Sequence, residues 1–460
     1  PQPFACMLRA GDVCPHVALR QSFATPTESH LTDITQPFLR MSFGSDTEGF
    51  DMISRRELIA QISASFLTSG RNFDRIRLAT VSLLDFGADP EKDAFPAAQA
   101  AIKHLKSIGG GILEFPGNGG RGWWLTQGVV IDRSNIHLRL AEDVRLLTNK
   151  PSPVFAFRGT RNAPIKSVSI AGDGKKVKID GGGDKVKSYV YNTSTYAPCV
   201  FFGWVSGWKA QNIYARNGLD GCFRAFQCEN GQFIDCDASN SIYDNGFSID
   251  FNLNPNATAN NTPRQYILNC RAWKCAGFGM TAYCSTNTSI VNGSVWECGN
   301  DDPQAPVSGG GISSEGDYKN AATASIDRNI VISNCTVRNC MNAGIFVTTG
   351  QTHIIDVVIS NTAAASRRKN DMTEKGSGIY FISAGSGSVI NTKIENSGTN
   401  GVTLVDNNGY VPNLQFDGSI EHSTLYGILV RRAGNVTISK RSMISNSGKQ
   451  PFINGSMQVQ

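Results

Sequence analysis

The chain has 460 residues, with 43 Lys and Arg against 38 Asp and Glu, for a formal net charge of +5. Charged residues make up only 18% of the chain and no basic run is interleaved with aromatics, so nucleic acid is not an expected partner. No apolar run reaches the roughly 18 residues of a membrane span, so none is expected.

The first 80 residues form an N-terminal extension in which residues 1–51 show no usable periodicity. Arg55 and Arg56 precede a mildly apolar segment at 60–67 and resemble a twin-arginine-type export signal near 52–67, for which Met52 would be the start. Such a signal predicts a periplasmic or extracellular location. The alternative is a short amphipathic helix. Its apolar face would consist of Leu58, Ile59, Ile62 and Phe66.

A strand with a turn at 84–90 and a helix at about 93–106 are expected next. The helix has one apolar face. That face comprises Phe95, Ala98, Ala101, Ile102 and Leu105. A new strand opens after Gly109–Gly111, and we expect the helix to cap the open end of a solenoid.

Five stretches then carry a resemblance to a known family. They read LDFGADP at 84–90, GGGILEFP at 109–116, SNIHLRLAEDVRLL at 134–147, VSIAGDG at 168–174 and IDGGG at 179–183. The chain resembles the pectate lyase and polygalacturonase superfamily of right-handed parallel β-helices. That resemblance implies a polysaccharide or oligosaccharide substrate but no particular reaction, because hydrolases, lyases, epimerases and phage tailspikes share this opening. The paired aspartates, Gly-His-Gly and Arg-Ile-Lys of polygalacturonases are missing here, so their catalytic residues are not carried over.

Seven similar lines, each led by a glycine, repeat between residues 244 and 432. Their glycines are Gly246, Gly279, Gly311, Gly344, Gly378, Gly401 and Gly427, at intervals of about 23 to 34 residues. Alternation with period two makes each line a strand, so the repeat predicts a β-solenoid. We therefore expect an all-β chain with one parallel β-helix domain over 81–455.

Aligning the lines on their glycines predicts which side chains share a face. If the residue after each glycine points inward, the residue three further on points outward. That outward column reads Asp250, Tyr283, Glu315, Thr348, Ile382, Val405 and Arg431. Rungs lie about 4.8 Å apart, so the backbones of Asp250 and Glu315 would be roughly 10 Å apart with Tyr283 between them. These three residues are the predicted catalytic group.

Insertions cluster over the same rungs and predict the walls of a substrate groove. They span residues 252–264, 300–309, 316–327 and 363–376. The candidate substrate-binding residues are Trp273, Trp296, Arg264, Asp244, Lys274, Arg338 and Asp317. Trp273 and Trp296 would point outward on successive rungs and offer flat faces to sugar rings, or else pack beneath a loop.

Twelve cysteines invite a disulfide interpretation, but six of them recur at two corners of the repeat. Cys236, Cys270 and Cys335 share one corner, and Cys275, Cys298 and Cys340 the other, where serines stand in other repeats. This exchange favours free, buried, stacked thiols over bridges or a metal site.

Three functions remain open from the sequence. A glycoside hydrolase would use the carboxylate pair Asp250 and Glu315, whose spacing suits an inverting enzyme better than a retaining one, without telling which is the acid. A uronate lyase or C5-epimerase would use Tyr283 as base, with Arg264, Lys274 or another cation as neutraliser, and could also hold Ca²⁺. A non-catalytic adhesin or tailspike would leave the column as a solvated polar face. The hydrolase is preferred, with no cofactor, as a monomer or homotrimer.

Overall fold

A computed structural model describes residues 78–186, 196–254, 256–258, 260–299, 309–316, 327–363, 376–382, 387–405, 413–431, 435–449, 452–453 and 456–459. The predicted extension over 1–80 lies outside these residues apart from its last three, and so does the export signal near 52–67. Asp317 also lies outside them.

The first described elements form one end of the stack. Strand β1 (Thr80–Ser82) leads into a 3-10 helix, η1 (Leu83–Phe86), where the sequence had predicted a strand. Ser82 causes the difference by capping: its Oγ accepts from the Leu84 amide at 3.2 Å, while Asp85 accepts from the Ser82 amide at 2.8 Å.

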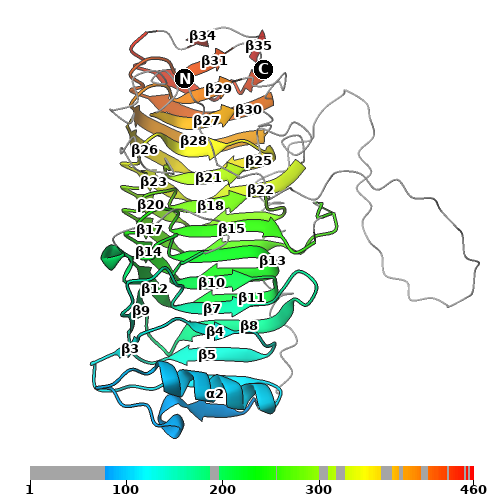
Figure 1. Ribbon diagram of the computed structural model, residues 1–460. Helices are drawn as coiled ribbons and strands as arrows, with labels where there is room; N and C mark the ends of the chain where they lie inside the picture. The colour runs from blue at the N-terminus through cyan, green and yellow to red at the C-terminus, as the bar shows by residue number, and fades with distance from the viewer. Residues whose placement is uncertain are drawn as a thin grey trace, which may run out of the picture. The chain divides into compact units, whose positions relative to one another are not determined.

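Helix α2 (Phe95–Ser107) confirms the predicted helix. Its buried residues are Ala97, Ala98, Ala101, Ile102 and Leu105. The helix packs on β2 (Gly111–Phe115) and β4 (Val129–Ile131), and Figure 1 shows it at one end of the stacked strands. A role in capping the solenoid stays a prediction.

Each full rung consists of three short strands on three faces, and each strand pairs in parallel with its equivalents in the neighbouring rungs. Face 1 contains the first strand of each rung, including the seven glycine-led strands. It comprises β4, β7 (Phe155–Arg158), β10 (Val200–Gly203), the first part of β13 (Phe223–Ile234), β15 (Phe247–Asn252), β18 (Met280–Tyr283), β21 (Ile312–Glu315), β24 (Ala343–Val347), β27 (Ser377–Ile382), β29 (Val402–Val405), β31 (Ile428–Arg431) and β34 (Phe452–Ile453). Figure 1 shows these strands one above another.

Face 2 contains the second strand of each rung. It comprises β1, β2, β5 (Ile136–Leu140), β8 (Ile165–Gly172), β11 (Val205–Gln211), the rest of β13, β16 (Gln265–Leu268), β19 (Thr288–Val291), β22 (Asp327–Ser333), β25 (Gly350–Ile355), the first parts of β28 (Gly387–Ser397) and β30 (Asn413–Glu421), β32 (Asn435–Ile438) and β35 (Ser456–Val459).

Face 3 completes each rung with a shorter strand. It comprises β3 (Trp123–Leu125), β6 (Val144–Leu146), β9 (Val177–Asp180), β12 (Ile213–Arg216), β14 (Asp237–Ser239), β17 (Arg271–Trp273), β20 (Ser294–Trp296), β23 (Thr336–Arg338), β26 (Val358–Thr362), the ends of β28 and β30, and β33 (Met443–Ser445). A second 3-10 helix, η2 (Gly183–Lys185), follows β9.

The core is built from inward columns, as the glycine alignment predicted. The residues after the seven glycines are paired in register and at most 1% exposed. They are Phe247, Met280, Ile312, Ile345, Ile379, Val402 and Ile428. Six of these glycines, all except Gly427, are required by packing: at Gly401, for example, an added Cβ would lie 2.3 Å from Cγ2 of Ile420.

A short turn joins face 2 to face 3 in successive rungs, and one residue of each turn has positive φ. These residues are mainly asparagines: Asn212, Asp235, Asn269, Asn292, Asn334, Asp356 and Asn391. Asn and Asp tolerate this left-handed conformation better than other residues with a side chain. Their amides also link the rungs, because Asn269 donates to Asp235 at 3.1 Å and Asn292 donates to Asn269 at 3.0 Å.

The cysteines confirm the prediction of stacked thiols, since the ten that the structure describes are buried and free. At one corner each thiol donates to a carbonyl of the preceding rung: Cys236 to Ala210 at 3.6 Å, and Cys270 to Phe233 at 3.7 Å. Cys6 and Cys14 lie outside the described residues. No helix in the described part of the chain is long and apolar enough to cross a membrane.

Candidate active site

The predicted outward column exists on face 1. Asp250 of β15 pairs with Tyr283 of β18, which pairs with Glu315 of β21. Ser248, Thr281 and Ser313 form a parallel column two residues earlier in the same strands. Asp250 and Glu315 are therefore two rungs apart with Tyr283 between them, as the alignment predicted.

Asp250 is 2% exposed. Its carboxylate is the centre of the acidic cluster, which also contains Arg224, Asp244, Glu315 and Tyr196. One oxygen accepts a hydrogen bond from Ser248, and the other lies 2.6 Å from Nε of Arg224. Nη1 of Arg224 lies 3.0 Å from the Asp244 carboxylate. Asp244 and Arg224 are buried too, so one guanidinium joins two carboxylates away from bulk water.

Tyr196 covers this arginine. The Arg224 guanidinium carbon lies 4.1 Å from the centre of the Tyr196 ring, a cation–π contact. The same ring lies 5.3 Å from that of Phe226 on β13. Burial raises the pKa of Tyr196 well above its ordinary value, although the charge of Arg224 opposes the shift.

Glu315 has different surroundings. Ser313 donates to its carboxylate at 2.7 Å, and Ser313 also lies 3.0 Å from the Thr281 hydroxyl. Burial raises the pKa of Glu315 to about 7; the Ser313 hydrogen bond opposes the shift, and the negative charges of Asp244 and Asp250 add to it. Glu315 is consequently able to keep a proton close to neutral pH.

Tyr283 is partly buried between the two carboxylate rungs. Its ring meets that of Phe251 edge to face, with the ring centres 5.4 Å apart. The three predicted catalytic side chains are therefore close together, and among the described candidate binding residues Asp244 alone lies with them.

The tryptophans lie elsewhere, on face 3. The rings of Trp273 and Trp296 stack 5.0 Å apart at an interplanar angle of 4°. Tyr214 stacks on Trp273 at 5.4 Å, and the Arg338 guanidinium lies over Trp296 at 5.6 Å from its centre. The ring faces expected to receive sugars are thus occupied by neighbouring side chains, so a role in sugar binding rests on the ring edges and stays a prediction.

The remaining candidates lie away from the acidic cluster. Arg264, at the start of face 2, donates to Ser289 at 3.0 Å, and burial lowers its pKa below the ordinary value. Lys274 lies at the corner after face 3, with its amino group 3.8 Å from the Glu297 carboxylate in an exposed pair. Their proposed binding roles stay predictions.

Two residues of the cluster, Arg224 and Tyr196, were missed from the sequence. Arg224 belongs to the rung before the seven aligned lines, where Gly221 and Cys222 precede Phe223. Because Phe223 pairs with Phe247, extending the alignment by one rung with Cys222 in the glycine position would have found Arg224 beside Ser248. Tyr196 lies before β10, outside any repeat, and its sequence gave no signal.

The described residues contain no group of three His, Cys, Asp or Glu side chains arranged to hold a metal ion. Binding of Ca²⁺ by a lyase therefore has no described site to rest on and stays a prediction.

No family model matches the chain, and no curated protein matches it. Solved structures do. The A-module of the Azotobacter vinelandii mannuronan C-5 epimerase AlgE6 is 15% identical, with a TM-score of 0.55 over 80% of this chain and 98% of that one. The catalytic unit of the GH87 α-1,3-glucanase from Streptomyces thermodiastaticus strain HF3-3 is 13% identical. Its TM-score is 0.55, over 83% of this chain and 68% of that one.

A tailspike protein double mutant of Escherichia coli bacteriophage HK620 is 16% identical, with a TM-score of 0.52 over 84% of this chain and 68% of that one. These likenesses, together with the parallel strand register, decide the architecture. The chain is a right-handed parallel β-helix. The fold expected from the opening motifs is confirmed, and at such low identity the likeness shows the fold alone.

Proposed function

We propose that this protein is a polysaccharide-degrading enzyme, most simply a glycoside hydrolase with Glu315 as its general acid. The observation that carries the proposal is the environment of Glu315. The pKa of Glu315 is raised to about 7. Two rungs away, the Asp250 carboxylate is ion-paired with Arg224. Glycoside hydrolysis needs this combination of a protonated and an ionised carboxyl group across the scissile bond.

Asp250 is the proposed partner carboxylate. Two rungs separate its backbone from that of Glu315 by roughly 10 Å, which suits the 6.5–9.5 Å between carboxyl groups in inverting enzymes better than the 5–5.5 Å in retaining ones. In this mechanism Glu315 gives its proton to the leaving oxygen, and Asp250 takes a proton from the attacking water. Tyr283 orients the sugar or the water between them.

The charge balance of the cluster favours a neutral sugar at the point of cleavage. Asp244 and Asp250 share the guanidinium of Arg224, and the carboxyl group of Glu315 feels the negative charge of both. A net negative site stabilises the positive charge that develops on the sugar ring in the transition state. It would repel the carboxylate of a uronate placed at the same point.

Tyr283 supports a second candidate, a uronate C5-epimerase or lyase. Its position between two carboxylate rungs suits a base that removes the C5 proton, and the epimerase modules of AlgE6 and AlgE4 are matched over 98% and 99% of their own length. Such an enzyme needs a cation to neutralise the substrate carboxylate, but Arg224 is already paired with Asp244 and Asp250.

The test is a panel of neutral and acidic polysaccharides incubated with the purified protein. Reducing ends and the ultraviolet absorbance of unsaturated products are followed together, and epimerisation is followed by nuclear magnetic resonance. We expect reducing ends to appear without unsaturated products. The rate of their release should fall at least a hundredfold in Glu315→Gln and in Asp250→Asn. The matched control is Asp173→Asn, which removes an exposed carboxylate elsewhere.

Other outcomes would replace the proposal. Unsaturated or epimerised products that depend on Tyr283 would identify a lyase or an epimerase. Glycan binding without turnover on any polysaccharide, unchanged in both variants, would identify a non-catalytic binding protein of the adhesin or tailspike type.

A further inference from the structure

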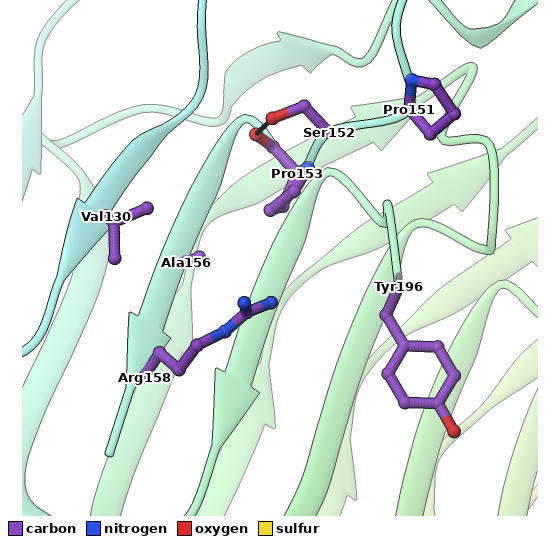
Figure 2. Close-up of a pocket in the computed structure, with 7 residues that line it drawn as sticks. All are labelled: Val130, Pro151, Ser152, Pro153, Ala156, Arg158 and Tyr196. Carbon is purple, nitrogen blue, oxygen red and sulfur yellow. Dashed lines mark hydrogen bonds between the residues drawn. The ribbon is translucent and has the colours of Figure 1, made fainter. Parts of the chain in front are cut away.

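A pocket opens on face 1 on the N-terminal side of the acidic cluster (Figure 2). Its volume is about 230 Å³, and it is lined by Val130, Pro151, Ser152, Pro153, Ala156, Arg158 and Tyr196. Figure 2 shows Val130, Ala156 and Arg158 on one side, Tyr196 opposite them, Pro153 above Ala156 and Pro151 above Tyr196. Pockets for drug-sized ligands measure roughly 300–1,000 Å³, so this one suits a smaller unit such as a single sugar.

Arg158 is the charged residue of the pocket, and it is available for a ligand. The residue is exposed, and its guanidinium lies over the Phe201 ring, 5.1 Å from the ring centre. Partial burial lowers the pKa of Arg158, and no acidic group among the described residues offsets this shift. A planar guanidinium held on an aromatic ring is suited to bind a carboxylate or sulfate.

The remaining lining suits a sugar ring. Val130 is 47% exposed, and together with the proline rings and Tyr196 it gives the pocket apolar walls. Ser152 adds a polar group at the rim. Apolar walls with a few fixed polar groups are the usual composition of small-ligand sites.

The pocket is joined to the acidic cluster in two ways. Tyr196 lines the pocket and carries the Arg224 guanidinium on its ring. Arg158 also stands in the same outward column as Asp250, because β7, β10, β13 and β15 pair in register. Three rungs separate the two residues, which places their backbones about 14 Å apart along the stack.

We propose that this pocket is a distal subsite that binds an acidic sugar unit of the substrate through Arg158. The inference rests on the proposal that face 1 binds a polysaccharide, and it specifies the class: an acidic heteropolysaccharide in which the charged unit lies several sugars from the bond that is cleaved. The chemistry at Arg158 is that of an anionic group on a sugar, either a carboxylate or a sulfate.

The experiment measures binding, not turnover. Defined hexasaccharides of three kinds are titrated calorimetrically into the full chain: uronate-containing, the same oligosaccharides with their carboxyl groups reduced, and sulfated. The variants are Arg158→Gln, Arg158→Lys and, as matched control, Arg161→Gln, which removes an exposed positive charge three residues away. Circular dichroism melts verify that each variant is folded.

We expect at least one charged hexasaccharide to bind, with its affinity at least tenfold lower in Arg158→Gln, partly retained in Arg158→Lys and unchanged in Arg161→Gln. Whether the uronate or the sulfated arm responds identifies the anion. Equal losses in Arg158→Gln and Arg161→Gln, no change in either, or binding of reduced oligosaccharides only would each overturn the inference, as would no binding of any charged hexasaccharide. Binding that depends on Arg158 without turnover would leave the inference standing and overturn the hydrolase.

Discussion

Asp250 and Glu315 carry the same chemical group in two different surroundings. The Asp250 carboxylate accepts hydrogen bonds from Ser248 and from the Arg224 guanidinium. Among the described residues, the Glu315 carboxylate accepts a side-chain hydrogen bond from Ser313. Burial without a cation leaves Glu315 with the raised pKa. The proposed assignment of Glu315 as acid and Asp250 as base, which the sequence left open, rests on this difference.

The raised pKa of Glu315 predicts how activity and stability depend on pH. A general acid must be protonated, so kcat/KM should fall as pH rises above about 7. The folded protein keeps the Glu315 proton above the ordinary pKa of 4.5, so this group's contribution to stability is full below pH 4.5 and is lost as pH rises through 7.

Glu315→Gln removes this titration. Relative to wild type, the variant should therefore be more stable at pH 8 than at pH 5, as measured by denaturant unfolding at both values. Asp173→Asn, at an exposed site, is the control. A stability difference that is the same at both pH values would contradict the raised pKa.

Arg224 should be indispensable to the cluster. Arg224→Ala leaves the buried carboxylates of Asp244 and Asp250 without their counter-charge, and loss of one partner of a buried ion pair costs about 3–5 kcal/mol. Chemical denaturation measures the loss. Adding Asp250→Asn should restore part of the stability, and an Arg224→Ala variant as stable as wild type would show that the pairs contribute nothing.

At the scale of the element, the glycine-led strand is the repeating unit of face 1 between residues 244 and 432. Each such strand buries alternate residues in the core and turns the others outward, so one strand supplies both packing and chemistry. The leading glycine lets the strand approach the face-3 residues of its rung, as Gly401 does at Ile420.

Gly401→Ala should therefore destabilise the protein, by about 1–3 kcal/mol, because the new methyl group overlaps Ile420 and the Gly427 carbonyl oxygen. Thermal or denaturant unfolding measures this. Gly117→Ala is the matched control, since its methyl would lie 3.9 Å from the nearest atom, an oxygen of Glu142. Equal effects of the two substitutions would remove the packing explanation.

The elements that could be predicted are those in which local pattern and packing agree. Period-two alternation behind a glycine predicted the column of Asp250, Tyr283 and Glu315. In a parallel, in-register stack, residues that align between repeats lie beside each other in neighbouring rungs. The Ser82 cap, which turns Leu83–Phe86 into a 3-10 helix, competes locally with an apolar strand pattern. The occupied faces of Trp273 and Trp296 depend on Tyr214, two rungs away, which no pattern within one repeat reveals.

At the scale of the whole molecule, stability is distributed along the stack. Each rung pairs with the rungs before and after it, so the energy is approximately a sum over neighbours. Asparagine side chains and buried thiols repeat this connection at the corners. The burial of Asp250 belongs to this scale, because it depends on what covers face 1 and not on the strand itself.

The thiols provide a test at this scale. The ten described cysteines are buried and free, so reductant should not change the unfolding temperature, and Ellman's reagent should react with them only after unfolding. The suitable protein is the double variant Cys6→Ser and Cys14→Ser, in which only described thiols remain. A lower unfolding temperature in reductant would show that this variant contains a disulfide.

Arg158, Asp250, Tyr283 and Glu315 lie in one column, so the number of rungs between two of them sets the distance between their backbones along the stack. Deleting the single rung that contains β10, β11 and β12 would bring Arg158 about 4.8 Å nearer to the carboxylates, although it would also remove the Phe201 ring on which the Arg158 guanidinium lies. If the pocket anchors the chain that is cut, the lengths of the released fragments should shift with the number of rungs. Product size would then be set by the spacing of the fold, separately from the chemistry of cleavage.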